Sequence, residues 1–136
     1  QVVSVSRLHL RDANDALMYA DGADGEPDKT KPMIAVIYGQ GSKQNSKWET
    51  IASNRLMQRL KKRGSKTDQT EEERREERVE LLMTCTQTLE NVAYGDLTGE
   101  AAMRAVFEDP LLGFIGDQIM AHRADWGNFS KAASTS

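Results

Sequence analysis

The sequence predicts an α+β protein in which an N-terminal β-hairpin or small antiparallel sheet is followed by a bundle of three to four α-helices. Residues 1–10 alternate apolar and polar side chains, apolar residues take helical spacing from Ser46 onward, and glycines at 39 and 41 separate the two regions. We therefore expect residues 1–43 to form the hairpin or sheet, and residues 44–136 to form a helical region with a C-terminal tail. The 136 residues suit one compact domain with both parts packed together.

Two apolar segments near the N-terminus have the pattern of β-strands. Residues 1–10 alternate apolar and polar side chains, and residues 33–38 are a continuous apolar run rich in Val and Ile. A shorter candidate strand lies at residues 16–19. Residues 21–28 are dense in Asp, Gly and Pro, which are typical of turns. The order of strand, turn and strand indicates an antiparallel hairpin.

The first helix is expected to begin at Ser46, because Ser46 and Glu49 have the form of a capping box. Gly64 is expected to end it, and the basic residues before Gly64 suit the negative end of the helix dipole. Apolar side chains follow one another at helical spacing, which predicts a single apolar stripe. The stripe consists of Trp48, Ile51, Ala52, Leu56 and Leu60.

A second helix is expected from Thr70, which forms a capping box with Glu73, to Gly95. Its first two turns are almost entirely charged, so we expect them to face solvent. Its apolar stripe is expected to consist of Val79, Leu82, Met83, Thr86, Leu89 and Ala93.

Two further helices are expected near the C-terminus. Thr98 is the expected N-cap of a short helix, and Asp109 followed by Pro110 has the form of an N-cap with proline at the first helical position. Gly127 is expected to end the last helix. The apolar residues of the two helices are Met103, Val106 and Phe107, then Leu112, Ile115, Ile119, His122 and Trp126.

The composition argues against several classes of protein. A net charge of −3 argues against a dedicated nucleic-acid binder. The single cysteine, Cys85, excludes an intramolecular disulfide and suits a reducing compartment. No apolar run approaches the ~18–20 residues that span a bilayer, so we expect no membrane partner. The first residues lack the features of a signal peptide, and the chain begins at Gln1, which leaves the true N-terminus open.

We expect no catalytic residue, no metal and no cofactor. His9 and His122 lie in different expected elements and lack metal-ligand spacing to Cys85 or to carboxylates. Cys85 lies between two threonines inside an expected helix, where a small half-buried cysteine is ordinary. No set of residues supplies a nucleophile, a base and oxyanion donors, which predicts that the chain is not an enzyme.

Two loops have a composition that resembles ligand-binding loops. Asp21–Glu26 resembles part of a calcium loop but lacks the twelve-residue ligand pattern and its closing glutamate. Gly39–Lys43 follows a strand and precedes a helix but lacks the spacing of a phosphate loop. We interpret both as turns, the second with amides that could bind an anion weakly.

A basic cluster lies at the end of the first expected helix, and an acidic stretch, Glu71–Glu80, opens the next. The cluster could contact nucleic acid through its positive charge. Alternatively, the two helices are antiparallel and their ends of opposite charge attract each other, which the acidic net charge favours. The candidate contact residues are Arg55, Arg59, Lys61, Lys62 and Arg63.

The C-terminal aromatic residues predict a protein-binding surface. Trp126 shares a stripe with the apolar residues of the last helix, whereas Phe114 leans toward Leu111, so the helix is apolar on two faces. Phe129 lies beyond the helix in a polar tail, which is a common form for a docking segment. The predicted surface consists of Leu111, Leu112, Phe114, Ile115, Ile119, Trp126 and Phe129.

Three stretches between residues 25 and 129 have motifs of a mostly structural kind. The first is a strand that ends in an aromatic–glycine turn, the second is an apolar helix that ends in Cys-Thr, and the third is the aromatic C-terminal ending. They are Gly25–Pro27 with Ile34–Ser42, Leu81–Thr86 with Leu97–Thr98, and Phe107–Pro110 with Phe114–Ile119 and Trp126–Phe129.

With these stretches the chain resembles the tail assembly chaperones of long-tailed (siphovirus-type) bacteriophages. The resemblance implies a late, non-enzymatic morphogenesis protein in the host bacterial cytoplasm. Such a protein binds the tape-measure protein, keeps its apolar helices soluble and helps to recruit tail-tube subunits. Two alternatives stay open, a structural virion subunit (a connector, tail or capsid-associated protein) and a small phage regulator that inhibits a host protein. A homo-oligomer is a further alternative.

Overall fold

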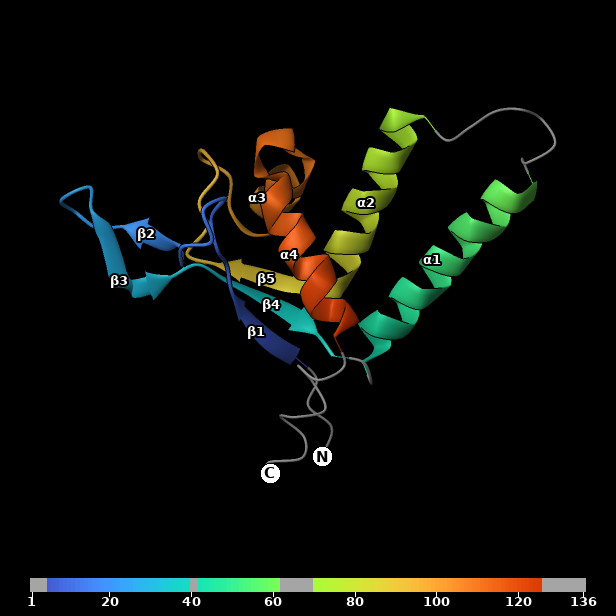
Figure 1. The fold of residues 1–136 in the computed structure, drawn as a ribbon, viewed down its shortest axis with the longest axis horizontal. Helices are drawn as coiled ribbons and strands as arrows, with labels where there is room; N and C mark the ends of the chain where they lie inside the picture. The colour runs from blue at the N-terminus through green and yellow to red at the C-terminus, as the bar shows by residue number, and fades with distance from the viewer. Residues whose placement is uncertain (1–4, 40–41, 62–69, 126–136) are drawn as a thin grey trace, which may run out of the picture.

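The central strand of the fold is β4 (Ile34–Tyr38), which is also the most apolar strand expected from the sequence. It pairs antiparallel with β1 (Val5–His9) on one side and with β5 (Thr86–Glu90) on the other. The first four residues of β4 are buried, as expected of a β-branched strand with a neighbour at each edge. The computed structural model describes residues 5–39, 42–61 and 70–125 (Figure 1).

A separate hairpin precedes β4. It consists of β2 (Tyr19–Asp21) and β3 (Pro27–Pro32), which pair antiparallel around the expected turn. Gly25 in the turn has a φ of 80°, a conformation that favours glycine. The hairpin is therefore confirmed, although the short strand expected at residues 16–19 begins only at Tyr19, and β4 pairs with β1 instead of with this segment.

Four helices complete the described part of the fold, within the three to four that the sequence predicts. Figure 1 shows α2, α3 and α4 on one face of the three-stranded sheet, whereas α1 projects beyond the end of the sheet and diverges from α2. None of the described helices is both long and apolar enough to cross a lipid bilayer. The helices are α1 (Lys43–Lys61), α2 (Glu71–Cys85), α3 (Gly99–Glu108) and α4 (Gly113–Ala124), with a 3-10 turn, η2 (Pro110–Leu112), before α4.

Two of the expected N-caps form hydrogen bonds at the starts of their helices. Thr70 Oγ1 accepts a hydrogen bond from Glu73 N at 3.1 Å, and Asp109 Oδ1 accepts one from Leu111 N at 2.9 Å with Pro110 at the start of η2, so both caps are confirmed. Thr98 precedes α3 but makes no side-chain capping bond.

The expected start of α1 at Ser46 is wrong. Ser42 Oγ accepts a hydrogen bond from Asn45 N at 3.0 Å and donates one to Gly39 O at 2.7 Å. Ser42 is therefore the N-cap, four residues before Ser46, because its hydroxyl accepts a bond from a first-turn amide and also closes the preceding turn.

The expected continuation of the second helix to Gly95 is also wrong. α2 ends at Cys85, and the next five residues form β5. β-branched Thr86 and Thr88 favour an extended chain, and pairing with the open edge of β4 satisfies their backbone. Gly95 instead occupies a turn, with a φ of 57°. The sheet therefore takes its third strand from the segment that the sequence predicts to be helical.

An ion pair crosses the face of the sheet that the helices leave open. Arg7 of β1 and Glu90 of β5 form two hydrogen bonds, Nη1 to Oε2 at 2.7 Å and Nη2 to Oε1 at 2.6 Å. On β4 these residues pair with Val36 and Ile34 respectively. The ion pair thus spans the central strand, whose Val36 and Ile34 are buried.

One apolar core lies between the sheet and α2, α3 and α4. Gly116 allows α4 to approach α2 closely, because a Cβ atom there would lie 2.9 Å from Leu82 Cδ1 and 2.5 Å from Arg78 Nη2. The Arg78 guanidinium donates to Gly113 O at 2.8 Å and to Asp117 Oδ1 at 3.0 Å. The most completely buried large side chains are Leu10, Ile37, Leu82, Val106, Ile115 and Ile119.

Candidate functional site

The surface that the sequence predicts around α4 is largely buried. Ile115 and Ile119 are core residues, 1% and 0% exposed, so their inclusion in a binding surface is wrong. Leu112 and Phe114 are half-buried against the core. α4 is apolar on more than one face because it packs against the sheet, α2 and α3. Leu111 alone is highly exposed, at 85%, whereas Trp126 and Phe129 lie outside the described residues.

The basic residues of α1 face the acidic residues of α2. Arg55 Nη2 lies 3.1 Å from Glu80 Oε1, and Arg59 Nη1 lies 2.9 Å from Glu77 Oε1. These ion pairs favour the interpretation that the two antiparallel helices attract each other through opposite charges. Arg55 and Arg59 are both engaged in these pairs. Lys61 is exposed at the end of α1, and Lys62 and Arg63 lie outside the described residues.

The apolar stripe of α1 is buried only in its first half. Ile51 and Ala52 are half-buried, but Leu56 and Leu60 are each 50% exposed, so the rest of the protein covers the predicted apolar stripe only as far as Ala52. The helix is about 28 Å long and diverges from α2 (Figure 1). The ion pairs of Arg55 and Arg59 bridge the two helices in this second half of α1. We call Leu56, Met57 (54% exposed) and Leu60 the α1 apolar face.

The first half of α1 is attached to α4 by a buried cation. Arg123 is 7% exposed and its Cζ atom lies 3.3 Å from the centroid of the Trp48 ring. Its Nη2 atom donates to Asn45 Oδ1 at 2.6 Å and to Glu49 Oε1 at 2.8 Å. The Trp48 ring and the Glu49 carboxylate together offset the cost of removing the Arg123 charge from water. Sequence reasoning missed this junction, because nothing in either segment indicates that the two helix ends meet.

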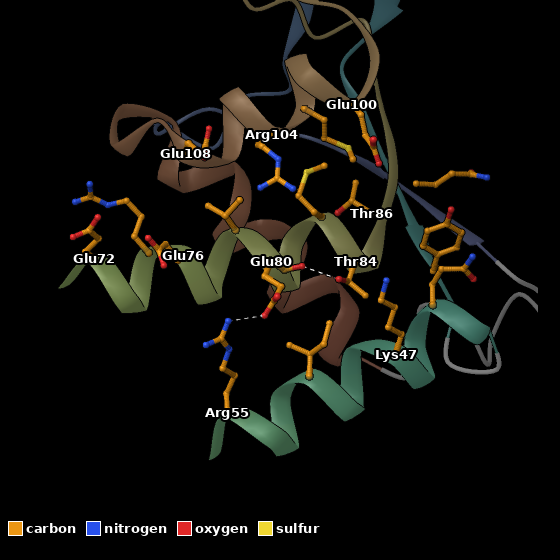
Figure 2. A pocket seen from close by; sticks show the side chains of 18 residues that line it. Lys47, Arg55, Glu72, Glu76, Glu80, Thr84, Thr86, Glu100, Arg104 and Glu108 are labelled. Atoms are coloured by element: carbon orange, nitrogen blue, oxygen red, sulfur yellow. Dashed lines mark hydrogen bonds and ion pairs between the residues drawn. The ribbon is translucent and has the colours of Figure 1, made fainter. Parts of the chain in front are cut away.

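A groove of about 870 Å³ lies between α1, α2 and α3 (Figure 2). Its lining includes apolar Ile51, Val79, Met83 and Met103, surrounded by charged residues. Figure 2 shows the side chains of Glu80 and Arg55 paired at one side and Glu100, Arg104 and Glu108 extending from α3 at the other. Apolar side chains beside charges of both signs suit an amphipathic segment of a protein. The charged residues are Lys47, Arg55, Glu72, Arg75, Glu76, Glu80, Glu100, Arg104 and Glu108.

The histidines and the cysteine have structural partners in separate places. His9 Nε2 lies 2.9 Å from Met18 O, and His122 Nε2 lies 2.8 Å from Ser6 Oγ. Burial lowers the pKa of His122 and raises the pKa of the Cys85 thiol, whose Sγ lies 3.8 Å from Thr86 Oγ1. Within residues 5–39, 42–61 and 70–125, no three His, Cys, Asp or Glu side chains come together as a metal site.

The two loops with ligand-like composition act as turns where they are described. Asp24 Oδ1 accepts a hydrogen bond from Glu26 N at 3.0 Å. The Asp24 carboxylate therefore stabilises the turn of the hairpin. Gly39 and Ser42 close the turn before α1, and residues 40 and 41 lie outside the described part of the chain.

No protein-family model, curated protein or solved structure matches this chain.

Proposed function

We propose that the chain is a non-enzymatic assembly chaperone that binds an amphipathic helix of a longer client protein along the α1 apolar face. The observation that carries the proposal is the half-exposed state of Leu56, Met57 and Leu60, side by side on a projecting helix. Covering what is still exposed of each would contribute about 1 kcal/mol to binding. Adjacent apolar side chains on one helix face are the usual contact for a second helix.

The charges of α1 favour a client helix with acidic flanks. Glu49 is the single acidic residue of α1, and it is paired with Arg123. Lys43, Lys47 and Lys61 form no ion pair with a described carboxylate. Acidic residues beside the apolar stripe of the client would therefore meet lysines, which favours association and selects the client's orientation.

The resemblance to tail assembly chaperones supports the tape-measure protein as the client. That protein is long and helical, and its apolar helices need cover before the tail is built. A projecting helix with an apolar face suits this role, which requires binding without a reaction. In this proposal the complex forms in the cytoplasm of the host bacterium, and tail-tube subunits are recruited to it.

Co-expression with fragments of the tape-measure protein from the same genome tests the proposal. The double substitution Leu56→Ser and Leu60→Ser should abolish co-purification and leave the client fragment insoluble. Leu17→Ser, at a leucine that is 41% exposed and lies just before β2, is the matched control and should retain binding. Circular dichroism checks that all variants fold.

Two results would contradict the proposal. Loss of binding in Leu111→Ser, with binding retained in the α1 double variant, would move the contact to the start of α4. Recovery of the chain from purified particles at fixed stoichiometry would identify a structural virion subunit instead of a chaperone, because a chaperone leaves the finished particle.

A further inference from the structure

β5 is an edge strand with one side open. β4 pairs with one side of Thr86–Glu90, and no other described segment forms a backbone hydrogen bond with the second side. In an antiparallel sheet, alternate residues of such a strand direct both N–H and C=O outward. Edge strands are commonly protected by Lys, Pro or a bulge. β5 has no Lys, Arg or Pro, and its bulge at Gln87 leaves Thr88–Glu90 in regular register.

Two hollows border this open strand on the side of the helices. The groove between α1, α2 and α3 reaches β5 at Thr86 and Gln87. A second hollow of about 320 Å³, here called the α3 hollow, borders Thr88 and Leu89. Thr86 at the first hollow and Thr88 at the second lie two residues apart along β5, or about 7 Å, which is the spacing of alternate side chains in a strand. The α3 hollow is mainly apolar, and its lining includes Leu89, Val92, Ala93, Leu97, Ala102, Met103 and Val106.

Arg104 provides a guanidinium beside the first hollow, in a groove that Glu100 and Glu108 of the same helix also line. Figure 2 shows Arg104 extending from α3 into the groove near Thr86. Arg104 forms no ion pair with any carboxylate in the described part of the chain. An acidic side chain that enters the groove beside β5 would therefore find a guanidinium partner.

We propose that β5 is a β-augmentation site, which takes an extended segment of a partner protein as a fourth strand of the sheet. The segment places an apolar side chain in the α3 hollow and an acidic side chain, two residues away, beside Arg104. Main-chain hydrogen bonds along β5 provide affinity, and the two hollows provide specificity. The site is separate from the α1 apolar face and does not depend on the helical client proposed above.

A second copy of the chain does not fit this site. In a two-fold pair of β5 strands, each copy would have to fill the α3 hollow of the other. The single large apolar residue of β5 is Leu89, which already packs against the core of its own chain. The single acidic residue is Glu90, which is paired with Arg7. A partner segment of different sequence is required.

Selection from a random peptide library on the full chain provides the probe. Selected peptides should carry an apolar and an acidic residue two positions apart. Each peptide is resynthesised with N-methyl groups on one alternating set of amides or on the other. One set should abolish binding and the other should leave it intact, because a strand directs alternate amides to its neighbour. Amide hydrogen exchange in Thr86–Glu90 should slow when the unmodified peptide binds.

Three variants locate the contact on the protein. Arg104→Glu should weaken the acidic peptide about tenfold and favour a peptide in which Lys replaces the acidic residue. Ala93→Trp, at an exposed residue that lines the α3 hollow, should block the apolar side chain. Lys29→Glu makes the same change of charge on the exposed hairpin and should leave binding unchanged.

The proposal is overturned by any of four results. Equal tolerance of both N-methylated sets, or affinity that is indifferent to Arg104→Glu, would show that the peptide does not bind as a strand here. Selected peptides that lose binding in the Leu56→Ser and Leu60→Ser variant would belong to the α1 apolar face. A dimer in sedimentation whose formation protects the β5 amides would make a second copy the occupant.

Discussion

The guanidinium of Arg123 lies over the indole of Trp48, with Cζ 3.3 Å from the ring centroid. Arg123 is in the last turn of α4, and Trp48 is in the second turn of α1. Because α1 projects beyond the sheet, this contact and the ion pairs with α2 determine where the helix points. The orientation of the α1 apolar face therefore depends on a cation that lies far from that face in the sequence.

Replacement of Arg123 by Ala should lower the free energy of unfolding by about 2–4 kcal/mol, because it removes the cation–π contact and two hydrogen bonds from a buried position. Chemical denaturation measures the loss, and hydrogen exchange should rise first in Lys43–Ala52. Glu49→Gln is the comparison, since the Glu49 side chain is 58% exposed and its ion pair contributes under about 1 kcal/mol. An equal loss of unfolding free energy in the two variants would contradict a stabilising role of the Arg123–Trp48 contact.

Gly116→Ala should destabilise the protein by about 1–3 kcal/mol, as overpacking between helices does. The added methyl would press on fully buried Leu82 and displace the Arg78 guanidinium from Gly113 O. Gly113→Ala is the matched control, because its Cβ atom would have nothing within 4 Å. Thermal unfolding should show a lower Tm for the first variant, and an unchanged or higher Tm for the second.

The stability of the fold should decrease as the pH falls below about 6.5, the ordinary pKa of histidine. Burial lowers the pKa of His122 in the folded protein, with Asp125 opposing the shift, so the unfolded chain binds the proton more readily. The stabilising contribution of neutral His122 is present above that pH and is lost as the pH falls through the lowered pKa. His122→Gln should remove this step from a plot of Tm against pH, and a step of unchanged size would refute its assignment to His122.

Cys85 should react with iodoacetamide only when the chain opens. The thiol is 1% exposed and its pKa is raised by burial, so little thiolate is present at neutral pH. The labelling rate, followed by mass spectrometry, should rise in denaturant in step with unfolding. Rapid labelling of the native protein would indicate that the end of α2 opens locally.

Local signals in the sequence predict much of this fold. The caps at Thr70 and Asp109 depend on neighbouring residues only, and so does the turn at Gly25. The attraction between the first two helices also follows from the charge pattern, because opposite charges meet wherever a short connection makes helices antiparallel. These features need no knowledge of distant contacts.

β5 shows why the prediction fails elsewhere. The bulge at Gln87 places Thr86 and Leu89 on the same face of the strand, opposite Ile37 and Ala35. This spacing of three residues resembles that of a helix, so the pattern predicts a longer α2. The open edge of β4 decides between the two structures, and that edge is far away in the sequence.

The exposure of the apolar helix faces was also hard to predict, because it too depends on contacts that are distant in the sequence. The stripes of α1 and α4 look equally apolar in sequence, yet Ile115 and Ile119 are enclosed by the sheet and two helices, whereas Leu56 and Leu60 are not. Amphipathic spacing indicates which side of a helix is apolar, but the length of the neighbouring elements determines how much of that side is covered.

The strand order β1-β4-β5 also has a consequence for synthesis on the ribosome. When β4 leaves the exit tunnel, one of its two neighbours has not yet been made, because α1 and α2 must be translated before β5. The ion pair between Arg7 and Glu90 cannot form before β5 has been made either. The emerging chain therefore carries an incomplete sheet until both helices and β5 have been added, and a truncation before residue 86 exposes the edge of its most apolar strand.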